Sequence, residues 1–166
     1  MNLYPNDFDI ICQNVTNLAL PIFAIPFNTR LRSEIISSLF EIESAKYFTN
    51  VKNATADHEP DLLFLESNTP LEIKVTKNKP YLKWMGNKIS KKESQFVLIV
   101  WDDLEPNLYS TNKGLKFYIT TTYLKPENWA SDDPYTYHAS FLSYNNIDNK
   151  IDLIGSKNKL KEYEVQ

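Results

Sequence analysis

The sequence predicts an α/β fold, with a mixed central β-sheet flanked by helices, and three observations support this class. One segment, 31–47, has the apolar spacing of an amphipathic helix. Short extended runs follow it, separated by turn-forming residues. The apolar run Phe96–Trp101 is unbroken, which is typical of a central strand covered on both faces. The chain of 166 residues suits a single domain over 1–166.

The predicted helix begins after Asn28 and Thr29, which form a capping signal. Its apolar side chains share one broad face of a helical wheel, namely Ile35, Ile36, Leu39, Phe40, Ile42 and Tyr47. The residues before this helix show no clear period. Two prolines interrupt the apolar stretch Leu18–Phe27, so we expect a hairpin or a packed loop there.

Five strands are expected after the helix. The second and third form a hairpin, because the turn-forming segment 66–70 joins them. Beyond residue 123 the chain is polar and aromatic, and we expect loops with one short helix. The core should therefore span about 31–122. The predicted strands lie near 47–52, 61–65, 71–75, 96–101 and 116–122.

Composition excludes several classes of protein. The single cysteine rules out an internal disulfide framework and a multi-cysteine zinc cluster, and two histidines are too few for a histidine-rich metal site. No run of about 18 apolar residues is present, so no membrane span is expected. The first ten residues carry two aspartates and no basic residue, which is unlike a signal peptide. We expect a cytoplasmic protein.

Asp61, Glu72 and Lys74 form the constellation with the clearest chemistry. Side chains alternate along a strand, so Glu72 and Lys74 project to one side of the strand 71–75, and the hairpin brings Asp61 beside Glu72. Two carboxylates can hold a hard cation such as Mg²⁺, which polarises a phosphate and lowers the pKa of a bound water. A lysine beside them can position that water. The pattern predicts a metal-dependent phosphodiesterase, and an exposed Glu–Lys strand face is the alternative interpretation.

The same residues carry a resemblance to a known family. Pro60-Asp61 with Glu72-Ile73-Lys74 resembles the motif of the PD-(D/E)XK nuclease superfamily. The strand Glu72–Lys77 is similar to the equivalent strand of archaeal Holliday-junction resolvases. The loop Trp84–Lys91, followed by the apolar strand, resembles small type II restriction endonucleases. The resemblance covers about residues 31–102.

The motif and the resemblance together imply a Mg²⁺-dependent type II site-specific deoxyribonuclease, in which Mn²⁺ can substitute. Asp61 and Glu72 would bind the metal, with the Ile73 carbonyl as a third ligand, and Lys74 would assist the attacking water. The substrate would be double-stranded DNA, and cleavage of both strands suits a symmetric homodimer. A cognate DNA methyltransferase is expected to be encoded nearby. The alternatives are a structure-selective junction or repair nuclease and a non-catalytic DNA-binding module on the same scaffold.

The family usually adds a glutamate from the first helix, and three glutamates compete for this role. Glu34 is the best match to the family pattern and is the expected catalytic residue. Glu43 lies on the apolar face of the helix and must find a partner there, for which Arg32 and Lys46 are available. Glu41 is the third alternative.

Charge is segregated along the chain. The formal net charge is −3, yet the stretch from Lys74 to Lys92 contains seven lysines and no acidic residue. Such a stretch is either a solvated surface or a surface that contacts DNA phosphates, which gives affinity but reads no sequence. Bases would be read from Asn87 onward and by the C-terminal third, which would serve recognition or dimerisation. The residues expected at the DNA are Lys77, Lys79, Lys83, Trp84, Asn87, Lys88, Ser90, Lys91 and Lys92.

Overall fold

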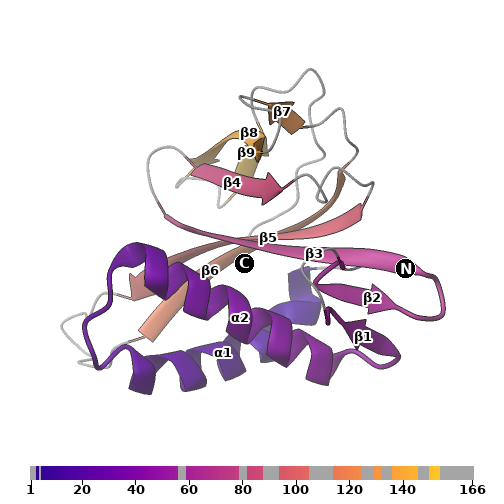
Figure 1. Cartoon of the computed structure of the whole chain (residues 1–166). Coiled ribbons are helices and arrows are strands. Elements are labelled where there is room, and N and C mark those ends of the chain that lie inside the picture. The colour runs from indigo at the N-terminus through magenta and orange to yellow at the C-terminus, as the bar shows by residue number, and fades with distance from the viewer. Residues whose placement is uncertain are drawn as a thin grey trace.

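The computed structural model is an α/β protein with a five-stranded mixed sheet and two helices (Figure 1). The described residues are 3, 5–55, 59–78, 82–87, 94–104, 114–124, 129–131, 136–145 and 150–153. Both helices cover one face of the five-stranded sheet, and a second, smaller sheet lies across the opposite face (Figure 1). The α/β class predicted from the sequence is confirmed.

Helix α1 (Asp9–Ile22) follows a short 3₁₀ helix, η1 (Pro5–Phe8). The expectation of a hairpin or packed loop over Leu18–Phe27 was wrong for its first part, because α1 continues through Ile22. Pro21 lies in the last turn of α1, one residue before the helix ends at Ile22. The helix packs on the sheet through residues spaced at i, i+4 and i+8, namely Ile11, Val15 and Ala19.

Helix α2 (Thr29–Tyr47) confirms the predicted helix, and its N-terminus is capped as the sequence indicates. The side-chain oxygen of Asn28 accepts a hydrogen bond from the backbone N–H of Leu31 at 2.9 Å. The buried face is narrower than the predicted stripe, because Ile42 is 46% exposed. The residues buried in α2 are Ile36, Phe40, Glu43 and Ser44.

The five-stranded sheet has the order β1-β2-β3-β5-β6. Only β3 and β5 are parallel within it, and the other neighbours are antiparallel. The predicted hairpin is confirmed, since Phe64 pairs with Thr69 across the turn. Asn68 takes a positive φ of 50° there, which asparagine tolerates better than most residues. The strands are β1 (Val51–Asn53), β2 (Leu62–Phe64), β3 (Thr69–Lys77), β5 (Ser94–Leu104) and β6 (Gly114–Leu124).

The central strand β5 is buried on both faces, as its unbroken apolar run predicts. Val97, Ile99 and Trp101 belong to the core cluster shared with the helices. The alternate residues Phe96, Leu98 and Val100 are also fully buried, on the face that the second sheet crosses. The parallel neighbour β3 is therefore held firmly in the middle of the sheet, which fixes the position of its charged residues.

The second sheet corrects two expectations. The expected loop Trp84–Lys91 begins inside a strand, β4 (Leu82–Asn87), and the described parts of the chain beyond Leu124 form strands where we expected loops with one short helix. The order is β4-β8-β7, with β9 paired to β8. The pairing of β4 with β8 joins residues that are about fifty to sixty positions apart, from Asn87 with Thr136 to Leu82 with Leu142, so no local sequence pattern predicts it. The remaining strands are β7 (Trp129–Ser131), β8 (Thr136–Asn145) and β9 (Lys150–Leu153).

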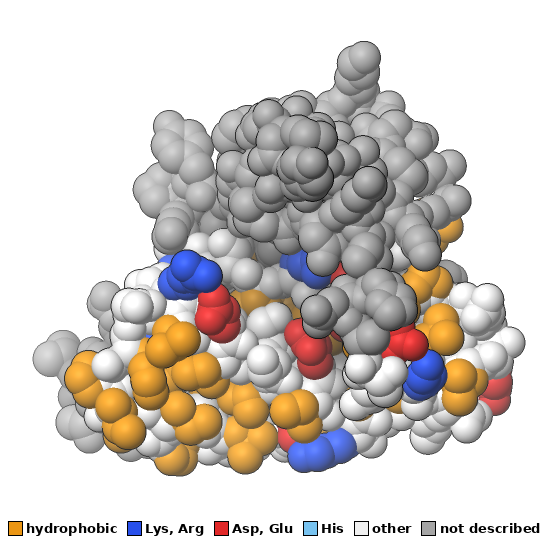
Figure 2. All heavy atoms as spheres, viewed as in Figure 1, with side chains coloured by type: hydrophobic (Ala, Val, Ile, Leu, Met, Phe, Trp, Pro, Cys, Tyr) orange, Lys and Arg blue, Asp and Glu red, His pale blue; other side chains and the backbone are white. Residues whose placement is uncertain are grey.

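The outer surface of the helix layer is unusually apolar. Figure 2 shows hydrophobic side chains gathered over this side of the molecule. Exposed large side chains from α1, from the α1–α2 connection and from α2 contribute, namely Leu18, Ile22, Ile25, Leu31 and Ile42. Within the described part of the chain, neither helix is long and apolar enough to cross a membrane.

Candidate active site

Asp61 occupies the position just before β2, where the β2–β3 ladder ends. Leu62 pairs with Leu71, so Asp61 comes next in register, opposite Glu72. Its Oδ2 accepts a hydrogen bond from the backbone N–H of Ile73 at 2.7 Å. In an antiparallel pair, one residue directs both its N–H and its C=O toward the same neighbour. The Ile73 carbonyl therefore points toward the Asp61 side of β3.

Glu72 and Lys74 lie on the same face of β3, as their spacing predicts. Lys74 Nζ donates to Glu72 Oε2 at 2.9 Å, and the Glu72 residue is 7% exposed. Burial raises the pKa of Glu72, the Lys74 ammonium opposes that rise, and the Asp61 carboxylate adds to it. The structure therefore brings Asp61, Glu72 and Lys74 together.

Lys74 is held as a cation. Burial alone would lower the pKa of Lys74, but the carboxylates of Glu72, Asp61 and Glu41 outweigh it and raise the pKa. An ammonium donates hydrogen bonds and stabilises negative charge, whereas it cannot accept a proton. This arrangement supports a role in orientation and charge stabilisation for Lys74, in preference to a role as the general base.

The helix glutamate beside these residues is Glu41. Its pKa is raised to about 7, first by burial and then by the nearby Asp61 carboxylate, while Lys74 lowers it. Ser37 Oγ lies one turn earlier and donates to Glu41 Oε1 at 3.4 Å. The charges of Asp61, Lys74 and Glu72 all act on the pKa of Glu41, so Glu41 lies within electrostatic range of these residues.

Glu34, the expected helix glutamate, and Glu43 make their contacts away from Lys74. Glu34 is 56% exposed and pairs with Arg30 at 3.0 Å. Glu34 shares a face with Glu41 but lies two turns away, about 10 Å along the axis. Glu43 is buried and accepts hydrogen bonds from Asn14 Nδ2 at 3.2 Å and Lys46 Nζ at 2.7 Å. Lys46, one of its two expected partners, is thus confirmed.

Sequence reasoning could have favoured Glu41 from one signal. Ser33, Ser37 and Glu41 form a polar row at i, i+4 and i+8 beside the apolar face of the helix. The spacing also shows that Glu34 and Glu41 share a face. The sequence does not show which turn of α2 lies over β3. The position of that turn along the helix determines whether Glu34 or Glu41 is nearer to the carboxylates of β3.

The donor groups around Asp61 fit a small hard cation. Asp61 directs only Oδ2 to the Ile73 N–H, which leaves its Oδ1 for a metal, while the Glu72 carboxylate accepts from Lys74 Nζ and from the Asp61 backbone. Among the described residues, no three His, Cys, Asp or Glu side chains are clustered tightly enough to hold a metal by themselves. Mg²⁺ does not need such a cage, because one or two carboxylates and several waters commonly suffice.

The residues predicted at the DNA have different positions. Lys77 forms ion pairs with Asp102 and with Asp103, the latter at 3.6 Å, and its Nζ lies 4.4 Å from the centroid of the Trp101 ring. The Lys77 ammonium is therefore already paired within the protein. Lys83, Trp84 and Asn87 are in strand β4, for which only the backbone is described. Lys79, Lys88, Ser90, Lys91 and Lys92 lie outside the described residues.

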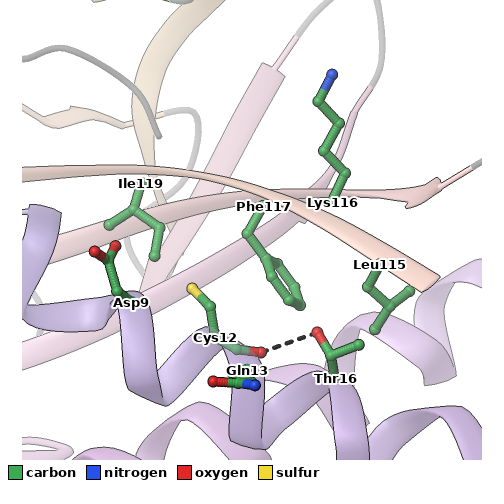
Figure 3. Close-up of a pocket in the computed structure, with 8 residues that line it drawn as sticks. All are labelled: Asp9, Cys12, Gln13, Thr16, Leu115, Lys116, Phe117 and Ile119. Atoms are coloured by element: carbon green, nitrogen blue, oxygen red, sulfur yellow. Dashed lines mark hydrogen bonds between the residues drawn. The ribbon is translucent and has the colours of Figure 1, made fainter.

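A hollow of about 440 Å³ lies between α1 and β6, and neither Asp61 nor Glu72 lines it (Figure 3). Its walls are mainly apolar, with Phe117 and Ile119 on β6 and Cys12 on α1. Burial and the neighbouring Asp9 raise the pKa of the Cys12 thiol to about 12. Cys12 is therefore a thiol at neutral pH and a poor nucleophile, so this hollow offers no catalytic group comparable with the cluster on β3.

Comparison with models of known protein families, with curated proteins and with solved structures finds no match to this chain. The function must therefore be argued from the chemistry of the cluster around Asp61.

Proposed function

We propose that the protein is a Mg²⁺-dependent endonuclease that hydrolyses phosphodiester bonds of double-stranded DNA at specific sites, as type II restriction enzymes do. One observation carries the proposal: the Asp61 carboxylate accepts the Ile73 N–H at the point where the ladder ends, which aligns it with Glu72 on β3. Lys74 pairs with Glu72, and Glu41 lies within electrostatic range of both carboxylates. Paired carboxylates with an adjacent ammonium suit metal-assisted attack of water on a phosphate.

Each residue of the cluster has its own role in the proposed reaction. Asp61 and Glu72 would hold the metal through carboxylate oxygens, with the Ile73 carbonyl as a third ligand. A bound Mg²⁺ would supply Lewis acidity and a water of lowered pKa. Lys74 would hold that water by hydrogen bonding and offset the charge that develops on the phosphate. Glu41 would orient the same water from the helix side. Mn²⁺ offers the same oxygen chemistry and should substitute.

The proposed partners follow from the reaction. Cleavage of both strands of a duplex suits a homodimer with two equivalent sites. The lysine-rich segment beyond Lys77 would supply phosphate contacts, which bind every sequence alike. A restriction enzyme would also need a DNA methyltransferase encoded nearby to protect host DNA.

Digestion of a mapped plasmid tests the proposal. Wild-type protein is incubated with Mg²⁺, with Mn²⁺ and with EDTA, beside a Lys74→Met variant and a Lys116→Met control. Lys116 is an exposed cation on β6, so its loss should leave cleavage unchanged. Discrete fragments that need the metal and Lys74 would support the proposal. Cleavage of four-way junctions alone would favour the junction nuclease, and DNA binding without cleavage in either metal would favour the binding module.

A further inference from the structure

A further carboxylate, that of Glu59, lies two residues before Asp61. Both of its oxygens accept hydrogen bonds. Its Oε2 accepts the backbone N–H of Thr55 at 2.6 Å and the Thr55 hydroxyl at 2.8 Å. Its Oε1 accepts Lys52 Nζ at 3.0 Å. We call this arrangement of Lys52, Thr55 and Glu59 the Glu59 clasp. With both oxygens in use, Glu59 is poorly suited to be a metal ligand itself.

The clasp ties the end of β1 to the chain that enters Asp61. A backbone hydrogen bond from Ala54 N–H to the Asp61 carbonyl, 3.2 Å long, runs beside it. Pro60 lies between Glu59 and Asp61, and its ring fixes its own φ. The backbone from Glu59 to Asp61 therefore has little freedom while the clasp is closed.

Asp61 lies beyond the end of the β2–β3 ladder, so its backbone is held mainly from the β1 side. The β2–β3 ladder begins at the Leu62–Leu71 pair, so Asp61 stands one residue outside it. The bond from Ile73 N–H to Asp61 Oδ2 depends on where the chain before β2 places the Asp61 backbone. Misplacement of a catalytic group by about 1 Å can cost on the order of 10²-fold in rate.

We propose that Glu59 is a positioning residue, which holds the Asp61 carboxylate against the Ile73 N–H and turns its second oxygen toward the metal. This inference rests on the proposed function for its catalytic consequence. The placement of Asp61 is a structural statement that can be tested without any cleavage. Glu59 acts only through Asp61 and touches neither metal nor DNA.

The test compares Glu59→Ala and Glu59→Gln with Glu66→Ala as a matched control. Glu66 is an exposed carboxylate of the β2–β3 hairpin and accepts one hydrogen bond, from Asn50 Nδ2 at 2.8 Å, but it lies at the opposite end of β2 from Asp61. Two readouts are taken on the free protein: hydrogen exchange of the Ile73 amide by NMR, and Mg²⁺ binding by calorimetry. Thermal melts show whether each variant is folded.

Glu59→Ala should accelerate exchange of the Ile73 amide and weaken Mg²⁺ binding by about 10- to 100-fold, the usual cost of losing a group that orients a ligand. Glu59→Gln retains an acceptor for Thr55 and should recover most of both properties. Glu66→Ala should match wild type. If Glu59→Ala does not fold, Thr55→Val removes one donor of the clasp and should show a smaller change in the same direction.

Wild-type protection of the Ile73 amide in folded Glu59→Ala would overturn the proposal, and so would an equal effect of Glu66→Ala. The outcome for the proposed function is separate. A wild-type protein that cuts no DNA but shows the predicted exchange pattern would retain the positioning role of Glu59 and lose the nuclease. A wild-type nuclease whose Glu59→Ala variant is unchanged in exchange and Mg²⁺ binding would retain the nuclease and lose the positioning role.

Discussion

Strand β3 carries two charged clusters, and they differ in how their charges balance. In the cluster around Lys74, one ammonium pairs with Glu72, and the charges of Asp61 and Glu41 also act on it. Near the end of the same strand, Lys77 and Arg32 face Asp102 and Asp103, so acids and bases are equal in number.

The pKa shifts of the two clusters run in opposite directions. Where carboxylates outnumber the cation, burial and mutual repulsion raise the pKa of Glu41 to about 7 and also raise that of Glu72. Hydrogen bonds and ion pairs from Lys77 and Arg32 outweigh burial and lower the pKa values of Asp102 and Asp103. An excess of negative charge is what a divalent cation would relieve, whereas the balanced cluster already satisfies its charges.

The balanced cluster also binds the layers together. The Arg32 guanidinium lies 4.6 Å from the ring centroids of both Phe23 and Trp101, and the Trp101 indole donates to Ser33 Oγ at 2.8 Å. These contacts attach the start of α2 to β5. The comparison therefore separates a cluster with an excess of carboxylates from a charge-balanced cluster that stabilises the fold.

Removing the cation from each cluster should give the largest contrast. Lys74→Met keeps the apolar stem but removes the charge beside Glu72, so plasmid cleavage in Mg²⁺ should fall by about 10²–10⁴-fold. Lys77→Met breaks partly exposed ion pairs and should lower the free energy of unfolding by about 1–2 kcal/mol. Cleavage should then stay near the wild-type level. Cleavage assays and urea melts on both variants measure the contrast. Wild-type cleavage by Lys74→Met would show that the two clusters do not differ in their role in activity.

The helix glutamates should show a smaller difference in activity. Glu41→Gln should reduce cleavage by about 10- to 100-fold, since it changes a group that orients the site. Glu34→Gln should leave cleavage unchanged, because Glu34 pairs with Arg30 in solvent. Glu43→Gln should lower the melting temperature and spare activity. Loss of cleavage in Glu34→Gln alone would return the role to the glutamate favoured by the family resemblance.

Local signals account for the parts of this comparison that the sequence predicts. The Asn28 cap marks the start of α2, and the turn after β2 fixes the hairpin that brings Asp61 to Glu72. Alternation along β3 then places Lys74 beside Glu72. Each of these depends on residues close together in the chain, which is where sequence patterns are strongest.

The features that the sequence did not predict depend on contacts between distant segments. Helix α1 buries a single row of residues, and its exposed apolar residues Leu18 and Ile22 obscured the period. The choice of Glu41 over Glu34 depends on where α2 crosses β3. The partners of Lys77 lie 25 and 26 positions later in the chain, so its ion pairs could not be read from the lysine-rich segment.

Metal binding should stabilise the protein through only one of the two clusters. A ligand that binds the native state alone stabilises it by about 2.7 kcal/mol at 100 times its dissociation constant. Mg²⁺ should therefore raise the melting temperature of wild type and of Asp102→Asn. Asp61→Asn and Glu72→Gln should lose this response. Calorimetric melts with Mg²⁺ and with EDTA measure it, and an equal response in Asp61→Asn would place the metal elsewhere.

Acidification should affect stability through the two clusters in opposite directions, with an effect of about 1 kcal/mol because both are partly open to solvent. Glu41 has an ordinary pKa near 4.5, raised to about 7 in the fold, so the native state takes up a proton first and stability rises as pH falls from about 7 toward 4.5. The raised pKa of Glu72 acts in the same direction.

Asp102 and Asp103 have an ordinary pKa near 3.8 that the fold lowers, so the stability they provide is present above that pH and is lost below it. Urea melts in EDTA between about pH 8 and pH 3 should therefore show a rise followed by a fall. Glu41→Gln should flatten the rise, because it removes one of the two groups that take up a proton there. Asp103→Asn should reduce the fall and leave the rise unchanged. Parallel curves for wild type and Glu41→Gln would mean that Glu41 is not coupled to the carboxylates of β3, and the contrast between the clusters would then depend on Glu72 alone.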